Sequence, residues 1–314
     1  MQHISWQDAP ERCYVIGPYL PPVATVSPGE RFSVETLDAF GNRVTGPDTP
    51  PTKVLSLPYV NPVTGPIYVE GAEKGDTLSV TIHEIKPARD FGVSATIPEF
   101  GGLCGTSLTR TLNEPLPERV WIHPITDEGI IFDPNLDIPK IPLEPFYGTM
   151  GTAPELEAIS TLAPGWHGGN MDAPDVCPGN IIYFPVCVAG ALLHLGDGHA
   201  AQGDGEVSGV AVEIPTFGTM TVDLIKGKSI VTPRIENSEY IMTVGNARPM
   251  EDAARIAFYE LVRWITLEYE IDRLDAYQLC SQVAKVRLAN MVDILYTIVA
   301  KFPKKYLPKR REIA

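Results

Sequence analysis

The segment at residues 194–206, HLGDGHAAQGDGE, concentrates side chains that bind metals or transfer protons. It contains two histidines, two aspartates, a glutamine and a glutamate, spaced by four glycines. Aspartate, histidine and glutamate are ordinary zinc ligands and ordinary general acids and bases. Because glycine permits tight turns and close backbone approach, such a loop can fold back and direct several side chains at one point. The alternative for each GDG is a polar surface turn.

Two more polar clusters carry the same kinds of side chain. In HGGNMD (167–172), Asp172 can ligate a metal and Asn170 can donate hydrogen bonds to a carbonyl oxygen. In VETLDAFGN (34–42), Glu35 and Asp38 flank the end of an apolar strand. Simple loops and solvated acids are the alternatives here. We predict that the three clusters meet in space, because a β-sandwich gathers its loops at strand ends and glycine turns.

The elements that must position these residues are mostly strands. Thirty prolines and 27 glycines punctuate short apolar runs, which is typical of strands and loops. The run 181–195 predicts two buried strands, and 207–214 with 219–225 predicts a hairpin. Helical spacing appears only at 250–271 and 275–295.

The predicted fold class is therefore mainly β with C-terminal helices (α+β). We expect a β-rich catalytic region over residues 1–245, with an option of two β subdomains joined near 117–148. A helical region over 246–314 would complete the same fold.

Composition excludes several classes of partner. A net charge of −14 and a pI near 4.9 disfavour nucleic acid and anionic membranes. Five cysteines without a C-x-x-C pair, and an N-terminus without a signal sequence, favour reduced thiols in a cytoplasmic protein. The sequence has no G-x-S-x-G elbow and no glycine-rich nucleotide loop.

Four segments together resemble the acetamidase/formamidase family, and the likeness runs from residue 10 to residue 303. They are PGERFSVETLDAFG (28–41), NPVTGPIYVEGAEKGDTL (61–78), GGNMD (168–172) and GDGHAAQGDGEVSG (196–209). The resemblance implies hydrolysis of formamide or acetamide to the acid and ammonia. It also implies a jelly-roll-like β-sandwich, a cytosolic homo-oligomer (dimer or higher) and a divalent metal, zinc or calcium.

The resemblance also suggests roles for the matching residues. We expect a divalent metal, Zn²⁺ ahead of Ca²⁺, to be held by Asp172, His194, Asp197, His199 and Asp204. We expect Asn170 to bind substrate, and Glu35, His199 and Glu206 to serve in catalysis. A metal can lower the pKa of bound water from ~15.7 to ~7 and polarise the amide carbonyl.

Spacing alone does not separate ligands from bases, and two other functions remain open. One is a non-catalytic calcium- or carbohydrate-binding β-sandwich module. The other is a metal-dependent hydrolase of another small C–N substrate.

Overall fold

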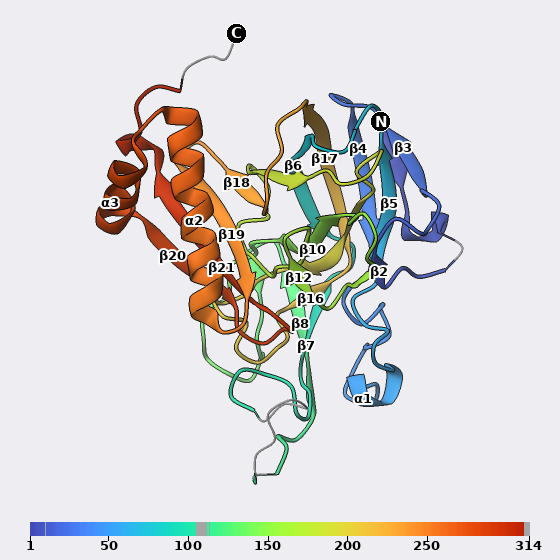
Figure 1. Ribbon diagram of the computed structural model, residues 1–314. Helices are drawn as coiled ribbons and strands as arrows, with labels where there is room; N and C mark the ends of the chain where they lie inside the picture. Colours follow the sequence, from blue (N-terminus) through green and yellow to red (C-terminus); the bar gives the residue numbers. More distant parts are fainter. Residues whose placement is uncertain (10, 105–111, 113, 311–314) are drawn as a thin grey trace.

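Two large β-sheets pack face to face in the computed structural model, which describes residues 1–9, 11–104, 112 and 114–310 (Figure 1). The nine-stranded sheet has the order β1 (Gln2–Ile4), β4 (Arg31–Thr36), β17 (Thr216–Ile225), β6 (Thr77–Pro87), β14 (Ile181–Pro185), β18 (Arg234–Glu236), β19 (Tyr240–Ala247), β21 (Tyr296–Pro303) and β20 (Lys285–Asn290).

The second sheet has ten strands. Its main path is β12 (Pro164–Gly165), β13 (Gly168–Asn170), β10 (Phe146–Thr152), β15 (Leu193–His199), β16 (Glu213–Ile214), β7 (Phe91–Thr96), β8 (Arg119–Thr126) and β9 (Gly129–Ile130). A branch adds β5 (Val63–Val69) beside β15, and β3 (Ala24–Val26) beside β5. A small separate sheet pairs β2 (Val15–Ile16) with β11 (Ile159–Ser160).

The main hydrophobic core lies between the two sheets. Alternating residues such as Phe32 and Val80 from one sheet meet Ile67, Met150 and Leu195 from the other, and all are buried. Successive side chains of a strand point to opposite faces of its sheet, so alternate residues enter this core. The expected mainly β fold with C-terminal helices is confirmed.

The described residues form few helices, and the two longest lie late in the chain. They are α1 (Pro51–Val54), α2 (Met250–Tyr269) and α3 (Arg273–Val283), with 3₁₀ turns at Trp6–Asp8 and Lys304–Tyr306. Helix α2 packs on β19 and β21 through an apolar face that includes Ala253, Ala257 and Leu261. No helix in the described part of the chain is long and apolar enough to cross a bilayer.

Two expectations about local structure were wrong. The helix expected over 275–295 ends at Val283, and Lys285–Asn290 instead forms strand β20, which pairs with β21. The pairing covers the edge of β21, so a long-range contact overrides local helical preference. The expected hairpin also fails, because β17 pairs with β4 and β6, and only Glu213–Ile214 of the upstream segment is a strand. The two buried strands expected in 181–195 are present as β14 and β15.

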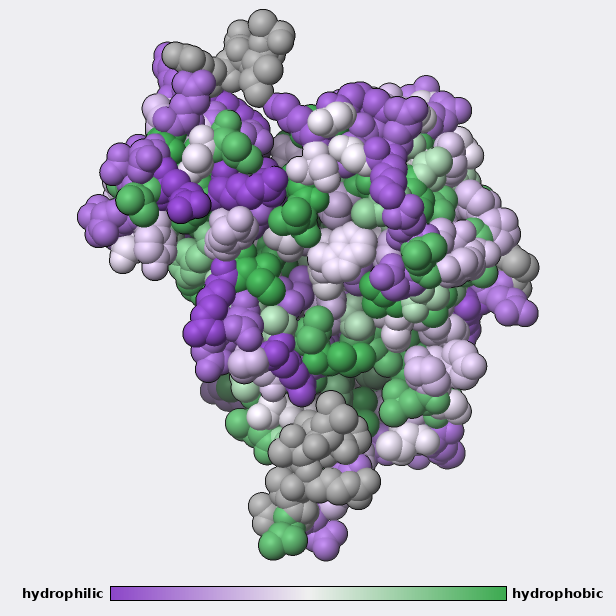
Figure 2. Space-filling model, viewed as in Figure 1, coloured by the Kyte–Doolittle hydropathy of each residue, from purple (hydrophilic) through white to green (hydrophobic). Residues whose placement is uncertain are grey.

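The division of the chain at residue 245 stays a prediction, and residues 311–314 of the C-terminal region lie outside the described residues. Figure 2 shows that hydrophobic side chains gather near the middle of this face, around β16. Hydrophilic side chains predominate above them, over the helices.

Candidate functional site

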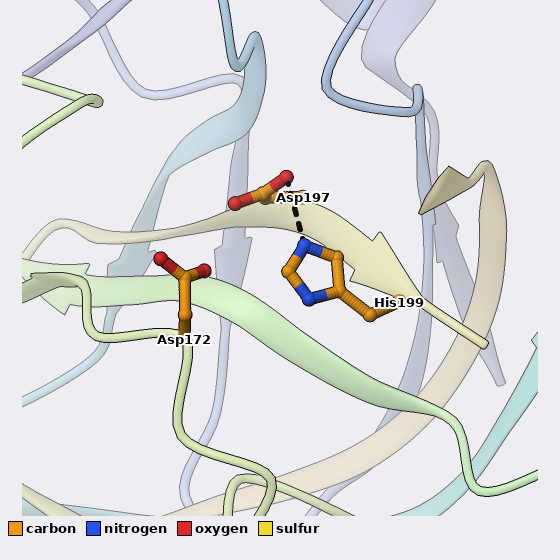
Figure 3. Close-up of side chains that lie close together, drawn as sticks. All are labelled: Asp172, Asp197 and His199. Carbon is orange, nitrogen blue, oxygen red and sulfur yellow. Dashed lines mark hydrogen bonds and ion pairs between the residues drawn. The ribbon is translucent and has the colours of Figure 1, made fainter. Parts of the chain in front are cut away.

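The candidate site lies where β15 ends between neighbouring loops. Asp197 and His199 belong to β15, and Asp172 follows β13 by two residues. Figure 3 shows the three side chains converging, although Asp172 comes from a separate segment. Ligand atoms of these residues all lie within 4.8 Å of one another. The expected meeting of the GGNMD and GDGH segments therefore occurs.

Glycines around the cluster are required by close packing. A Cβ at Gly198 would lie 2.2 Å from the Thr216 Cγ2 atom. A Cβ at Gly148 of strand β10 would lie 2.5 Å from the Asp172 Oδ1 atom and 2.7 Å from the Asp197 Oδ2 atom. Gly148 thus leaves open the space between the two carboxylates.

The backbone is strained at several residues of the site. Asp172, Asp197 and Glu206 have φ values of 42°, 55° and 45°, and Asn61 has 55°. Non-glycine residues rarely adopt this left-handed region, and each instance costs about 1–3 kcal/mol that the surrounding structure must offset. The fold holds these side chains in directions that relaxed strands and turns would not give.

Asparagine side chains join the acids to one another. The Asn170 amide donates to Asp172 Oδ2 at 3.1 Å and to Asp293 Oδ2 at 2.8 Å. The Asn290 amide donates to the same two oxygens, at 3.2 Å and 2.7 Å. The Asn170 carbonyl oxygen accepts from Thr149 and from Asn61. Both amide hydrogens of Asn170 are therefore engaged by carboxylates.

His199 is held in one orientation by Gln202. The Gln202 amide donates to two backbone carbonyls, those of Asp172 at 2.8 Å and Ala289 at 3.0 Å. Its oxygen must then face His199 Nδ1, 2.9 Å away, as an acceptor. This contact places a hydrogen on Nδ1 and leaves Nε2 directed at Asp197 (3.3 Å) and Glu213 (3.2 Å).

The electrostatics of the site are dominated by buried acids. Five carboxylates belong to it, each less than 9% exposed: Asp172, Asp197, Glu206, Glu213 and Asp293. Burial raises the pKa of Asp172 well above its ordinary value, and the charges of Asp293 and Asp197 raise it further. Burial likewise raises the pKa of Glu206, with the charge of Asp172 adding to the effect.

The other acids and the histidine follow the same logic. Burial raises the pKa of Glu213 to about 7, although His199 opposes the shift. Burial also raises the pKa of Asp293 to about 7. Burial alone would lower the pKa of His199, but the charges of Glu213 and Asp197 outweigh it and raise that pKa well above its ordinary value. The cluster therefore needs bound protons or a cation to balance its charge.

The donor set fits a divalent cation. Asp172, Asp197 and His199 form one group with metal-ligand spacing, and His199, Glu206 and Glu213 form a second, overlapping one. Asp172 Oδ1 is buried without a hydrogen-bond partner. Nε2 of His199, which belongs to both groups, lies close to Asp197 of the first and Glu213 of the second. One imidazole with carboxylates matches Zn²⁺, whereas Ca²⁺ takes oxygen ligands.

A small cavity of about 60 Å³ opens onto the cluster. The acids and His199 line it together with five large apolar side chains: Phe40, Val60, Ile97, Phe100 and Leu162. A pocket with these walls can hold a small molecule that has one polar group and little else.

Five of the residues expected from the sequence meet here: Asn170, Asp172, Asp197, His199 and Glu206. Three others lie elsewhere. The Glu35 carboxylate accepts a hydrogen bond from Ser5 at 2.8 Å, toward the surface. The Asp204 side chain is 57% exposed and pairs with Arg287 at 2.9 Å.

His194 is the third residue outside the cavity. It is buried, and its Nδ1 is 2.9 Å from the carbonyl oxygen of Leu192. The structure gives Glu35, Asp204 and His194 no contact with the cluster, and the roles expected of all the residues stay predictions.

Sequence reasoning missed six residues of the site: Asn61, Thr149, Gln202, Glu213, Asn290 and Asp293. Two of them carried a visible signal, because Glu213 and Asp293 are single acids inside apolar runs, VAVEI and MVDIL. An acid in such a run must find a partner or become neutral when it is buried. Asn61 opens the NPVTG segment on which the family resemblance rests.

Comparison with known proteins places the chain in a family. The model of the Acetamidase/Formamidase family matches residues 6–160 and 155–306. A formamidase of Methylophilus methylotrophus is 30% identical over 256 residues, 67% of this chain and 63% of that protein. An acetamidase of Mycolicibacterium smegmatis is 30% identical over 266 residues, 67% of this chain and 65% of that protein. The matches thus span less than two thirds of each relative's length.

A solved structure agrees with these matches over nearly the whole chain. The crystal structure of an acetamidase from Yersinia enterocolitica superposes with a TM-score of 0.94 at 44% identity. It covers 98% of this chain and 93% of that one. On this evidence of sequence and fold, the chain belongs to the Acetamidase/Formamidase family.

Proposed function

We propose that this protein hydrolyses short linear amides, formamide and acetamide, to the carboxylic acid and ammonia. The observation that carries the proposal is the cavity of about 60 Å³, which is lined both by acids with His199 and by apolar residues. Formamide has three heavy atoms and acetamide four, so both are of the size that such a cavity admits. The names of the relatives, formamidase and acetamidase, support the same substrate class.

We propose that Asp172, Asp197 and His199 would hold a divalent cation, with Zn²⁺ ahead of Ca²⁺. When bound, such a cation supplies a Lewis acid that polarises an amide carbonyl and lowers the pKa of water. Gln202 keeps Nε2 of His199 directed inward, and Asn170 and Asn290 hold the carboxylates of Asp172 and Asp293 in place. We therefore propose that Asn170 acts as a positioning residue, since both of its amide hydrogens are already engaged.

The protein's own groups can move the protons that hydrolysis requires. We propose that Glu206 accepts a proton from the attacking water as the new C–O bond forms at the carbonyl carbon. It then gives the proton to the amide nitrogen, and the C–N bond breaks to release ammonia. Burial raises the pKa of Glu206 well above its ordinary value, which makes its carboxylate a stronger base when it is ionised. Glu206 lines the same cavity as Asp172 and Asp197.

The test is ammonia release by the purified protein from formamide and acetamide. It is measured on the protein as isolated, after exhaustive chelation, and after addition of Zn²⁺ or Ca²⁺, with metal content determined by mass spectrometry. We expect chelation to abolish release and Zn²⁺ to restore it. Full activity in metal-free protein would overturn the proposed role of the metal. Failure of metal-replete protein to release ammonia would overturn the proposed amidase activity. A homo-oligomer and a cytoplasmic location also remain proposals, the former testable by light scattering.

A further inference from the structure

A second cavity adjoins the site and has no role in the chemistry proposed above. It measures about 730 Å³, and much of its wall is apolar, with contributions from Ala95, Trp121, Phe132, Ile141 and Val212. Three residues line both cavities: Phe100, Glu206 and Val210. The small cavity and the large one are therefore neighbours that share a wall.

Phe100 is the largest side chain of that wall, and the backbone holds it in place. It closes a turn after β7 in which the Phe100 amide donates to the Ile97 carbonyl at 3.1 Å. Its ring lies against Gly209, where a Cβ would be 2.5 Å from the Phe100 Cε1 atom. The neighbouring Gly102 amide donates to the carbonyl of Val207 at 2.8 Å. The ring is thus fixed against the turn that follows Glu206.

We infer that Phe100 determines substrate size by separating the catalytic cavity from an apolar subsite. The inference rests on the proposed amidase function. With the ring in place, the acyl group of an amide has only the small cavity of about 60 Å³. With the ring removed, an unbranched acyl chain can extend past Glu206 into the large cavity.

The walls of the large cavity specify the class of chain that it would take. Its aromatic and aliphatic side chains favour methylene groups, and each one buried is worth about a fourfold gain in binding. Three acids that line it, Glu144, Asp204 and Glu206, disfavour a negatively charged chain. The subsite therefore fits neutral, apolar acyl groups.

The experiment compares kcat/KM for formamide, acetamide, butyramide and hexanamide in the wild type, Phe100→Leu and Phe100→Ala. Phe217→Ala is the matched control, because Phe217 is 44% exposed on β17 and lines neither cavity. We expect the ratio of hexanamide to acetamide to rise at least tenfold in Phe100→Ala and less in Phe100→Leu. Phe217→Ala should keep the wild-type ratio.

A competition assay on the wild type makes the test independent of whether the variants fold. In the wild type, the inhibition constant of hexanamide against acetamide hydrolysis should be at least tenfold higher than the KM of acetamide. An inhibition constant close to the KM of acetamide would overturn the role of Phe100. So would an unchanged ratio of kcat/KM for hexanamide to that for acetamide in a variant that still hydrolyses acetamide. Loss of all activity in both variants, with unchanged melting temperatures, would also overturn it. Failure of the wild type to hydrolyse formamide and acetamide would instead refute the proposed function.

Discussion

Gly148→Ala tests whether the space between Asp172 and Asp197 is where the chemistry occurs. The added Cβ would lie 2.5 Å and 2.7 Å from carboxylate oxygens of these residues, whereas ordinary contact begins at 3.4 Å. The two carboxylates must therefore move by most of an ångström, or the backbone of β10 must shift. Misplacement of a reacting group by about 1 Å can cost about 100-fold in rate.

The expected result for Gly148→Ala is a loss of at least about 100-fold in kcat/KM for formamide, with reduced metal content. Overpacking costs typically about 1–3 kcal/mol of stability, so the protein should remain folded. The measurements are ammonia release, bound metal and thermal unfolding. Gly46→Ala is the control, because nothing lies within 4 Å of its Cβ position and its φ is not in the left-handed region.

If Gly148→Ala keeps more than about a third of wild-type turnover and a full complement of metal, the gap between the carboxylates is not used. A comparable loss in Gly46→Ala would show that the effect is not specific to the site.

Three further predictions concern Asp197, Gln202 and His194. Asp197→Asn should lower turnover by about two orders of magnitude or more while the protein stays folded. Asp204 is exposed and lies outside the cluster, so Asp204→Asn should stay active. Equal losses of ammonia release in the two variants would contradict this prediction. Gln202→Leu should lower metal affinity about 10- to 100-fold by titration, since His199 Nδ1 loses its acceptor; wild-type affinity would contradict it. Burial lowers the pKa of His194 from 6.5 to about 4, so as pH falls the unfolded chain gains a proton at His194 before the folded protein does. The free energy of unfolding should therefore decline between pH 6.5 and pH 4, by up to about 3 kcal/mol from this residue. Urea unfolding of His194→Gln should show a shallower decline, and a decline identical to that of the wild type would refute the role given to His194.

Local sequence predicted the part of the site that is local. The GDGH and GGNMD segments could be found because glycine and acid alternate within a few residues, and the structure brings Asp172 and Asp197 together. Glu213 and Asp293 were missed, since their place beside His199 and Asn170 depends on contacts between distant segments. Glu35 was expected in the site from its motif, but its carboxylate turns toward Ser5.

The fold shows the same limit. The apolar run 181–195 and the helical spacing of 250–271 were sufficient to predict β14 with β15 and α2, because each pattern reflects burial against the core. The structure of segment 285–290 is not determined by its own sequence pattern. It becomes a strand because β21 offers an edge to pair with, and that partner lies beyond the window in which local preference operates.

The loop between β20 and β21 has a consequence for how the protein is made. Asn290, the last residue of β20, and Asp293, in the loop that follows, hold Asn170 and Asp172, which are synthesised much earlier. Chains emerge from the ribosome N-terminus first, and N-terminal parts generally fold first. A nascent chain that has already exposed Asp172, Asp197 and His199 therefore still lacks the groups that fix the carboxylates. We therefore expect the proposed cation to bind only after translation has passed Asp293 and the last strands have joined the sheet.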